Sequence, residues 1–346
     1  MAFRGRYLIP IALIAAIAPI PVRWVELAYS RTFYLSIQPY VTSASNLSPF
    51  ALLDIAIALI LLTGTVAFVR DRGLSGWRPA LVRAAGRLAK TGALIYILFL
   101  VTWGLNYRRI PLEAKLDFDP SRITPEAAPK LAVEAIERLN AGYVAAHARP
   151  LSKESLQRAF AEAQLLLGAA RIATTGRPKR SFAGLYFRYA AIDGMTVPVF
   201  LEVILNPDIL PVEEPSVLAH EWAHLAGYAD ESEANFVAWI TGVRSQDPVA
   251  QYSAWLDAYR LAAGALPRAM RGSLPPLNDG PRQDLRDIAA RFERSSPRVR
   301  TAARGVYDSY LKANRIHEGI ANYTIVLQLI LGTAFEEGWT PRVRGG

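Results

Sequence analysis

Three long apolar runs near the start of the chain constrain its fold more than any other feature. About twenty apolar residues let a helix cross a bilayer, and the second run carries only one charge, Asp54. The first run also resembles a signal peptide, but Pro19 and Pro21 follow its small residues, which favours a retained anchor. The sequence therefore predicts a membrane region before residue 108. The predicted transmembrane helices are about residues 7–28, 49–69 and 91–107.

Positive charge is distributed unevenly around these runs. Arg4 and Arg6 precede the first run, and residues 70–90 carry six basic side chains against one acid. Because basic loops stay in the cytoplasm, both segments are expected there. Three spans then place everything after Tyr107 outside. We expect a multi-pass protein of the cytoplasmic (inner) membrane with an extracytoplasmic C-terminal domain. The net charge of +9 reflects this topology and indicates no nucleic-acid partner.

The sequence His220-Glu221-Trp-Ala-His224 is an H-E-x-x-H motif in an apolar, helix-forming segment. Residues four apart share one face of a helix, so the two imidazoles can bind one metal ion. Glu221 is near enough to act on a water at that metal. The chain has four histidines and no cysteine, so a metal site must use nitrogen and oxygen ligands, which suit Zn²⁺.

Three carboxylates compete for the third ligand position. Asp230 follows His224 at a spacing that resembles metzincins, with aspartate replacing their third histidine. Glu233 is a second alternative, although with Asp230 it also forms a helix capping box. The segment from Glu231 resembles the second metal helix of gluzincins, which favours Glu231 as the ligand. By the same resemblance, Asn235 would hold a histidine ring.

The remainder of the chain predicts a linker at residues 108–130 and a mostly helical domain at 131–346. Amphipathic helices are expected before and after the motif. Residues 184–206 favour two or three short strands, with a turn at Asp193-Gly194. Residues 200–206 are a candidate edge strand for peptide substrate. The predicted fold class is mainly α (α+β), with a small sheet.

The chain resembles an uncharacterised bacterial membrane family, known only as a domain of unknown function. Members have three N-terminal spans and an H-E-x-x-H domain. The resemblance implies a zincin-like fold and no known substrate. Glu202 and Asn206 fit the family pattern, which suggests substrate-strand or metal-supporting roles. The matching positions are Trp103-Gly-Leu-Asn-Tyr107, Gly194, Pro198, Glu202, Asn206, the metal motif with Gly227, Glu231-Ser-Glu-Ala-Asn-Phe236, Tyr252-Ser253, Tyr310-Leu-Lys312, Gly319 and Tyr323.

These features predict a membrane-anchored zinc metalloendopeptidase that acts on a peptide or protein substrate. Zinc would activate a water, and Glu221 would act as the general base. Tyr323 and His317 are the downstream candidates for stabilising the transition state. The alternative is a non-catalytic binding or signalling module with a structural zinc site. The retained Glu221 favours catalysis, because a structural zinc needs no base. The expected partners are the substrate and the lipid bilayer.

Overall fold

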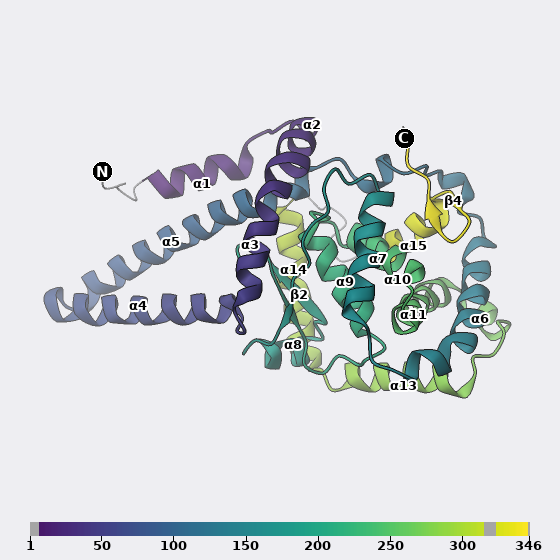
Figure 1. Ribbon diagram of the computed structural model, residues 1–346. Coiled ribbons are helices and arrows are strands. Elements are labelled where there is room, and N and C mark those ends of the chain that lie inside the picture. Colours follow the sequence, from purple (N-terminus) through teal and green to yellow (C-terminus); the bar gives the residue numbers. More distant parts are fainter. Residues whose placement is uncertain (1–6, 315–322, 345–346) are drawn as a thin grey trace.

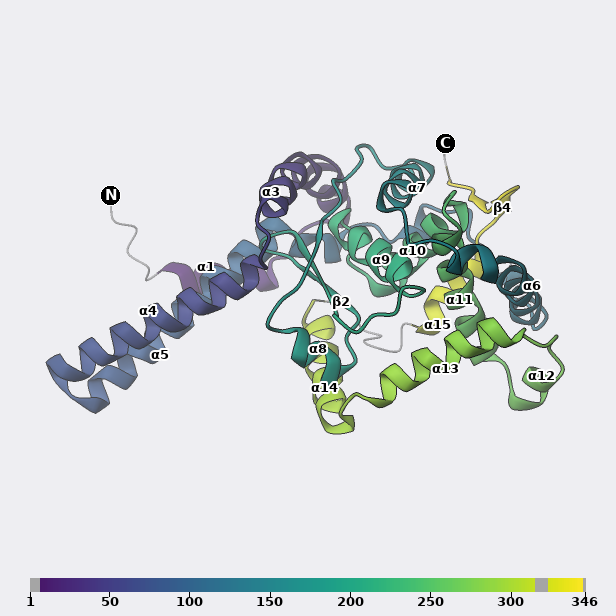
Figure 2. The same cartoon turned by 60° about the horizontal axis from the view of Figure 1, so that its bottom comes forward.

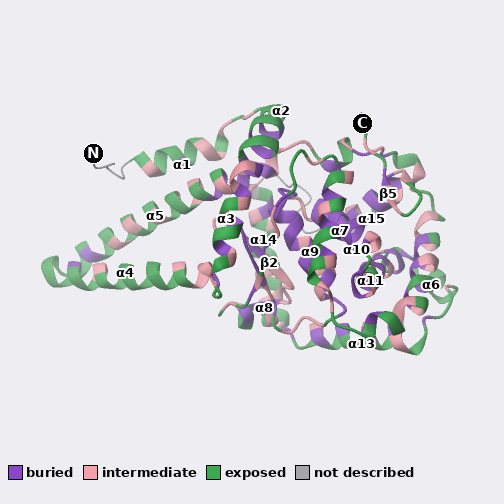
Figure 3. Ribbon diagram, viewed as in Figure 1, coloured by how far each residue is buried: buried purple, intermediate pink, exposed green. Residues whose placement is uncertain are grey.

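Two apolar helices, α4 (Leu52–Ser75) and α5 (Trp77–Thr102), form a hairpin that projects from the rest of the molecule (Figure 1). The computed structural model describes residues 7–314 and 323–344. Both helices are long and apolar enough to cross a membrane. Most of their side chains are exposed, as a lipid-facing surface requires (Figure 3). Gly76 joins the helices with a φ of 81°, a conformation that other residues rarely adopt.

The hairpin corrects one predicted boundary. The helix that contains the third predicted span begins at Trp77 and not at residue 91, so most of the basic segment expected to be a loop is helical. Its alanines, leucines and arginines are good helix formers, which explains the difference. Arg83 and Arg87 of this segment pair with Asp71 of α4 at 3.4 and 2.7 Å. These ion pairs join the two helices near the end that lies away from the domain.

The first apolar run does not form one straight span. Helix α1 (Leu8–Ile17) ends before Pro19, and the chain bends by 108° into a helical segment at 22–47. Proline lacks a backbone N–H, which explains why the helix stops here. The predicted span at 7–28 is therefore corrected: within the described residues there are two candidate spans, and a third only if the bent pair counts as one. The segment consists of α2 (Val22–Trp24), the π-helical η2 (Val25–Tyr34) and α3 (Leu35–Leu47).

Residues from both sides of the hairpin form one hydrophobic core. Tyr34 and Leu35 precede the hairpin, and they are buried in the same cluster as Trp103 and Trp222. Segment 22–47 therefore packs with the domain that follows the hairpin. Helices α9 and α10 lie inside this domain, and the others surround them (Figures 2 and 3). The main helices are α6 (Ala127–His147), α7 (Lys153–Leu166), α9 (Glu214–Leu225), α10 (Glu231–Arg244), α11 (Pro248–Ala265) and α15 (Tyr323–Gly332).

A three-stranded sheet lies against α9. Its order is β1-β3-β2, with β1 (Pro178–Lys179) parallel and β2 (Gly194–Val197) antiparallel to β3 (Glu202–Leu205). The prediction that residues 200–206 form a substrate-binding edge is therefore wrong, because β3 has a neighbour on each side. The first part of the segment 184–206, which was expected to form strands, is instead helix α8 (Gly184–Ala190), which buries Phe187 and is followed by Ala191 in the left-handed conformation. The prediction of a mainly helical fold with a small sheet is confirmed.

The segment predicted to be a linker packs against the domain. Leu112, Leu116 and Phe118 are buried, and two β-bridges join residues 116 and 118 to Val343 and Thr333. Surface helices complete the fold on the far side from the hairpin and beside α8 (Figure 2). The remaining elements are η3 (Gly104–Arg108), η4 (Leu112–Ala114), η5 (Pro120–Arg122), α12 (Arg268–Gly272), α13 (Asp279–Glu293), α14 (Pro297–Ala313), β4 (Phe335–Glu336) and β5 (Thr340–Pro341).

Glu202 attaches the sheet to the α4–α5 hairpin. Its carboxylate accepts hydrogen bonds from the backbone amides of Leu52 and Leu53, each at 2.8 Å, at the start of α4. It also pairs with Lys179 at 2.8 Å, and both side chains are almost fully buried. An acid at a helix N-terminus stabilises that end of the helix, so this contact orients the hairpin on the domain.

We predict that Glu202→Gln destabilises the protein. Breaking a buried ion pair leaves Lys179 without its counter-charge and costs about 3–5 kcal/mol. Thermal unfolding of the full chain in detergent would measure the loss. A matched substitution of an exposed acid, Glu137→Gln, should leave the unfolding temperature nearly unchanged. Equal unfolding temperatures for the two variants would contradict the anchoring role of Glu202.

Candidate metal centre

Helices α9 and α10 carry the residues of the predicted metal site. Helix α9 begins with Pro215 in its first turn and ends at Leu225, one residue after the motif. A short turn follows, and Asp230 caps α10 by accepting hydrogen bonds from the amides of Ser232 and Glu233. This cap starts α10 at Glu231, so Glu231 faces the motif from the first position of the helix.

Three side chains converge on one point. His220 Nε2 lies 3.1 Å from His224 Nε2 and 3.2 Å from Glu231 Oε2. His224 Nε2 lies 3.4 Å from Glu231 Oε1. Two ligands of a tetrahedral zinc ion, each about 2.1 Å from the metal, are separated by roughly 3.4 Å. The three side chains therefore match a zinc ion in donor type and in spacing, and among the described residues they are the group identified as able to hold a metal.

Hydrogen bonds on the outer ring nitrogens orient both imidazoles. His220 Nδ1 lies 3.1 Å from the side-chain oxygen of Asn235, whose amide nitrogen donates to the carbonyl of Glu231. His224 Nδ1 lies 2.7 Å from the carbonyl oxygen of Tyr228. Because both Nδ1 atoms face acceptors, they carry the protons, and the Nε2 lone pairs face the cluster. Asn235 thus lies where the resemblance implied.

Glu221 is buried beside this cluster and held by strand β2. The hydroxyl of Thr196 lies 2.8 Å from Glu221 Oε2 and 2.9 Å from the Glu221 carbonyl oxygen. A Cβ on Gly194 would lie only 2.7 Å from Glu221 Oε1, so the carboxylate occupies space that only glycine leaves open. Burial raises the pKa of Glu221, although the neighbouring histidines oppose this shift. A carboxylate with a raised pKa is suited to accept and release a proton.

The two alternative carboxylates do not join the cluster. Asp230 is used as the cap of α10. Glu233 points to the opposite side, where its Oε1 accepts a hydrogen bond from the amide of Leu112 at 2.5 Å. Burial raises the pKa of Glu233 to about 7, while Arg109 opposes that shift. Glu231 is therefore the carboxylate that faces both histidines.

Tyr307 of α14 also reaches the cluster, where its hydroxyl donates to Glu231 Oε1. Tyr307 stacks on Tyr310 with ring centroids 6.0 Å apart, and Tyr310 packs against Tyr107 at 6.1 Å. Sequence reasoning did not select Tyr307. The three-residue spacing of Tyr307 and Tyr310 on one helix face was the available signal. Of the two residues that were selected, His317 lies outside the described residues, and the side chain of Tyr323 is not described.

The predicted substrate-strand residues have structural contacts instead. Glu202 binds Lys179 and the start of α4, as described above. Asn206 donates from its side-chain nitrogen to the carbonyl of Ile192 and accepts from the amide of Asp208. Both side chains are buried, and their hydrogen bonds maintain the ends of β3. Neither lies among the metal-facing donors.

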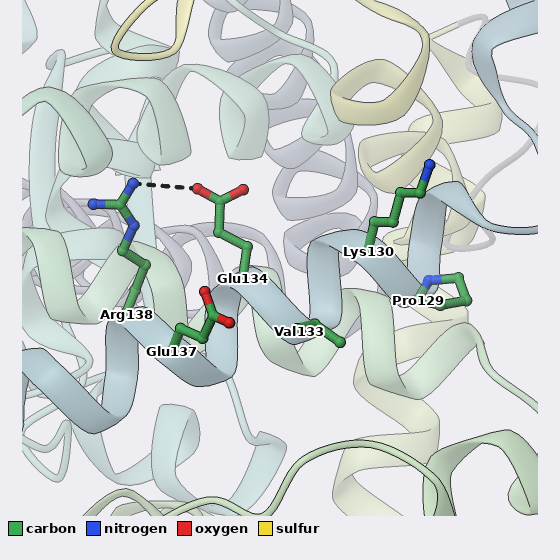
Figure 4. Close-up of a pocket in the computed structure, with 6 residues that line it drawn as sticks. All are labelled: Pro129, Lys130, Val133, Glu134, Glu137 and Arg138. Carbon is green, nitrogen blue, oxygen red and sulfur yellow. Dashed lines mark hydrogen bonds and ion pairs between the residues drawn. The ribbon is translucent and has the colours of Figure 1, made fainter.

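A hollow on the outer surface of α6 is separate from this centre. Its lining residues all come from one helix, and Arg138 within it pairs with Glu134 at 3.3 Å (Figure 4). None of the cluster residues contributes to it. The hollow is therefore a feature of an exposed helix face and does not extend the metal centre. Its lining consists of Pro129, Lys130, Val133, Glu134, Glu137 and Arg138.

We predict that Asn235→Ala weakens zinc binding roughly 10–100-fold, because residues that orient a ligating histidine usually contribute by that amount. Competition with a chromophoric chelator on the detergent-solubilised full chain would measure the affinity. Asn140→Ala removes the same amide from α6, where its partners are Pro276 and Asn278, and should have no effect. Equal affinities for the two variants would exclude a role for Asn235 in holding His220.

Comparison with known proteins supports one part of the resemblance, membership of a family of unknown function. No curated protein and no solved structure matches the chain. Residues 29–331 match the family described as Protein of unknown function (DUF3810). This range extends from η2 through α15 and includes the hairpin and the whole metal centre. The chain belongs to the DUF3810 family.

Proposed function

We propose that the chain is a membrane-anchored zinc-dependent peptidase. The observation that carries this proposal is the convergence of His220, His224 and Glu231 beside the buried carboxylate of Glu221. Structural zinc sites use four protein ligands, whereas catalytic sites use three and leave a position open. Among the described residues, the cluster offers three. The donor count and the adjacent base therefore favour catalysis over a structural zinc in a binding module.

The chemistry divides between the metal and the protein. A bound zinc ion would supply a Lewis acid that acidifies water and polarises a peptide carbonyl. Glu221 would take the proton of the attacking water and pass it to the leaving amine. Thr196 holds the Glu221 carboxylate in place during both transfers. Tyr307, whose hydroxyl reaches the cluster edge, is our candidate donor for the developing oxyanion.

The free edge of β2 supports a peptide substrate. The amide of Asn206 donates to the carbonyl of Asp193 at 2.9 Å, so Asp193 and Asn206 form a hydrogen-bonded pair of the antiparallel strands. Such pairs alternate along antiparallel strands, so Gly194 and Thr196 direct their own amides and carbonyls away from β3. No other strand pairs with this edge in the part of the chain that the structure describes. An extended peptide could add there as a further strand, next to Glu221.

The arrangement of charge supports an extracytoplasmic location. The hairpin turn at Gly76 carries Arg70, Arg72 and Arg78 at the end that lies away from the domain. Basic residues remain on the cytoplasmic side of a membrane, so the turn would be cytoplasmic. Both ends of the hairpin that meet the domain would then be outside. We propose a cytoplasmic-membrane protein with its metal domain on the outer side.

Two variants should distinguish loss of activity from loss of the metal. Glu221→Gln should retain one zinc per chain but lose activity by roughly 10²–10⁴-fold, because the general base is removed. His220→Ala with His224→Ala should lose the metal. Elemental analysis and a peptide-cleavage screen on the full chain would test both. Residues before the hairpin belong to the core, so a truncated outer domain is unsuitable. Full activity in Glu221→Gln would refute the peptidase proposal.

We also predict that Tyr307→Phe lowers kcat by roughly 10²-fold with unchanged zinc content, because loss of one oxyanion donor commonly costs that much or more. Tyr310→Phe is the matched control, since its hydroxyl hydrogen-bonds with Tyr107, whereas the Tyr307 hydroxyl donates to Glu231. It should keep most of the parent kcat. If both variants behave alike, Tyr307 is not the oxyanion donor.

A further inference from the structure

Exposed apolar and aromatic side chains gather at the end of the hairpin that meets the domain. Phe182 is 91% exposed, Leu47 85% and Phe50 69%. Large exposed apolar patches mark sites of contact with a membrane or another protein. We refer to this set as the root rim. It consists of Leu47, Phe50, Phe182, Leu185, Tyr186 and Tyr189.

The root rim is bound to the first turn of α4. Asp54 of that turn accepts hydrogen bonds from the Ser181 hydroxyl at 2.5 Å and from the Phe182 amide at 3.0 Å. Leu47 and Phe50 directly precede the same helix. The root rim therefore lies beside the start of α4, where the hairpin joins the domain, and these contacts hold it there.

Helix α8 exposes apolar residues although its opposite face is buried. Phe187 packs with Ala51, Val197 and Ile204 in a small core. Leu185, Tyr186 and Tyr189 point away from that core and are exposed. Tyrosines are enriched where a protein meets the lipid headgroups, since the ring is apolar and the hydroxyl is polar. The composition of this face suits a lipid interface better than water.

We propose that the bilayer crossed by α4 and α5 also covers the root rim, so that the domain lies on the lipid surface. The occupant of this face is lipid, because the rim is continuous with the membrane hairpin. Phe99 of α5 packs on Trp103 at 6.1 Å, and Trp103 packs on His224 at 5.9 Å. The metal centre therefore lies immediately above the end of a span. A further step rests on the proposed function: the substrate would be a polypeptide segment held at the bilayer surface.

The absence of cysteine makes this location measurable with single labels. Phe182→Cys and Tyr186→Cys would carry a nitroxide in the full chain, reconstituted in nanodiscs of phosphatidylcholine and phosphatidylglycerol. A nitroxide in lipid is relaxed more strongly by dissolved oxygen than by a water-soluble nickel chelate, because oxygen enters the bilayer and the chelate stays in water. We expect this pattern at both rim positions. Val144→Cys on α6, which is 77% exposed and apolar, is the matched control and should show the reverse.

Either of two other results would overturn the proposal. A rim label that responds to nickel as strongly as Val144→Cys would place the rim in water. A label shielded from both reagents would indicate a protein partner or a second copy of the chain. The measurement needs no activity, so it stands even if the peptidase proposal fails.

A second measurement tests the surface-held substrate. For an active enzyme, a lipid-anchored peptide should be cleaved at least 10-fold faster than the free peptide, and equal rates would contradict a surface-held substrate.

Discussion

The end of α9 is the constraint on which the candidate metal centre depends. A helix leaves its last carbonyl groups without partners inside the helix. Here the partners come from segments that adjoin the membrane hairpin, so the position of the second histidine is coupled to that region. Trp103 Nε1 donates to the carbonyl of His224 at 2.7 Å, the Tyr34 hydroxyl to Leu225 at 2.7 Å, and Arg109 to Gly227 at 3.0 Å.

Arg109 has this role because other groups hold it in place. Its guanidinium lies 3.3 Å from the buried carboxylate of Glu26 and over the ring of Tyr228 at 5.0 Å. Glu26 also binds Lys115 at 2.6 Å. Burial and the neighbouring Arg109 lower the pKa of Lys115 to about 8. A buried charge without a partner is costly, so these groups stay together and Arg109 stays at the end of α9.

Helical spacing predicted much of the centre, because its main residues are local in sequence. His220, His224 and Asn235 follow from periodicity and from resemblance, and the structure places them around one point. Tyr307 and Thr196 could not be found that way, since distant elements bring them to the site. The choice among the three carboxylates needed the fold: Asp230 is used in a helix cap, and Glu233 accepts a hydrogen bond from the backbone amide of Leu112.

The segment 184–190 was misread because its aromatic residues favour a strand locally. In the structure its buried residues, Gly184, Phe187 and Ala190, recur every third position, as on one face of an amphipathic helix.

The hairpin is an insertion within the domain, and this has a consequence for assembly. Tyr34 comes before α4, Trp103 comes after α5, and both bind the end of α9. The core can close only when the segments on the two sides of the hairpin are on the same side of the membrane. If only one of the two helices crossed the membrane, Tyr34 and Trp103 would lie on opposite sides, and one of these donors would be missing at His224 or Leu225. If the hairpin crosses the membrane as proposed, insertion of both helices is therefore a requirement for bringing His220, His224 and Glu231 together.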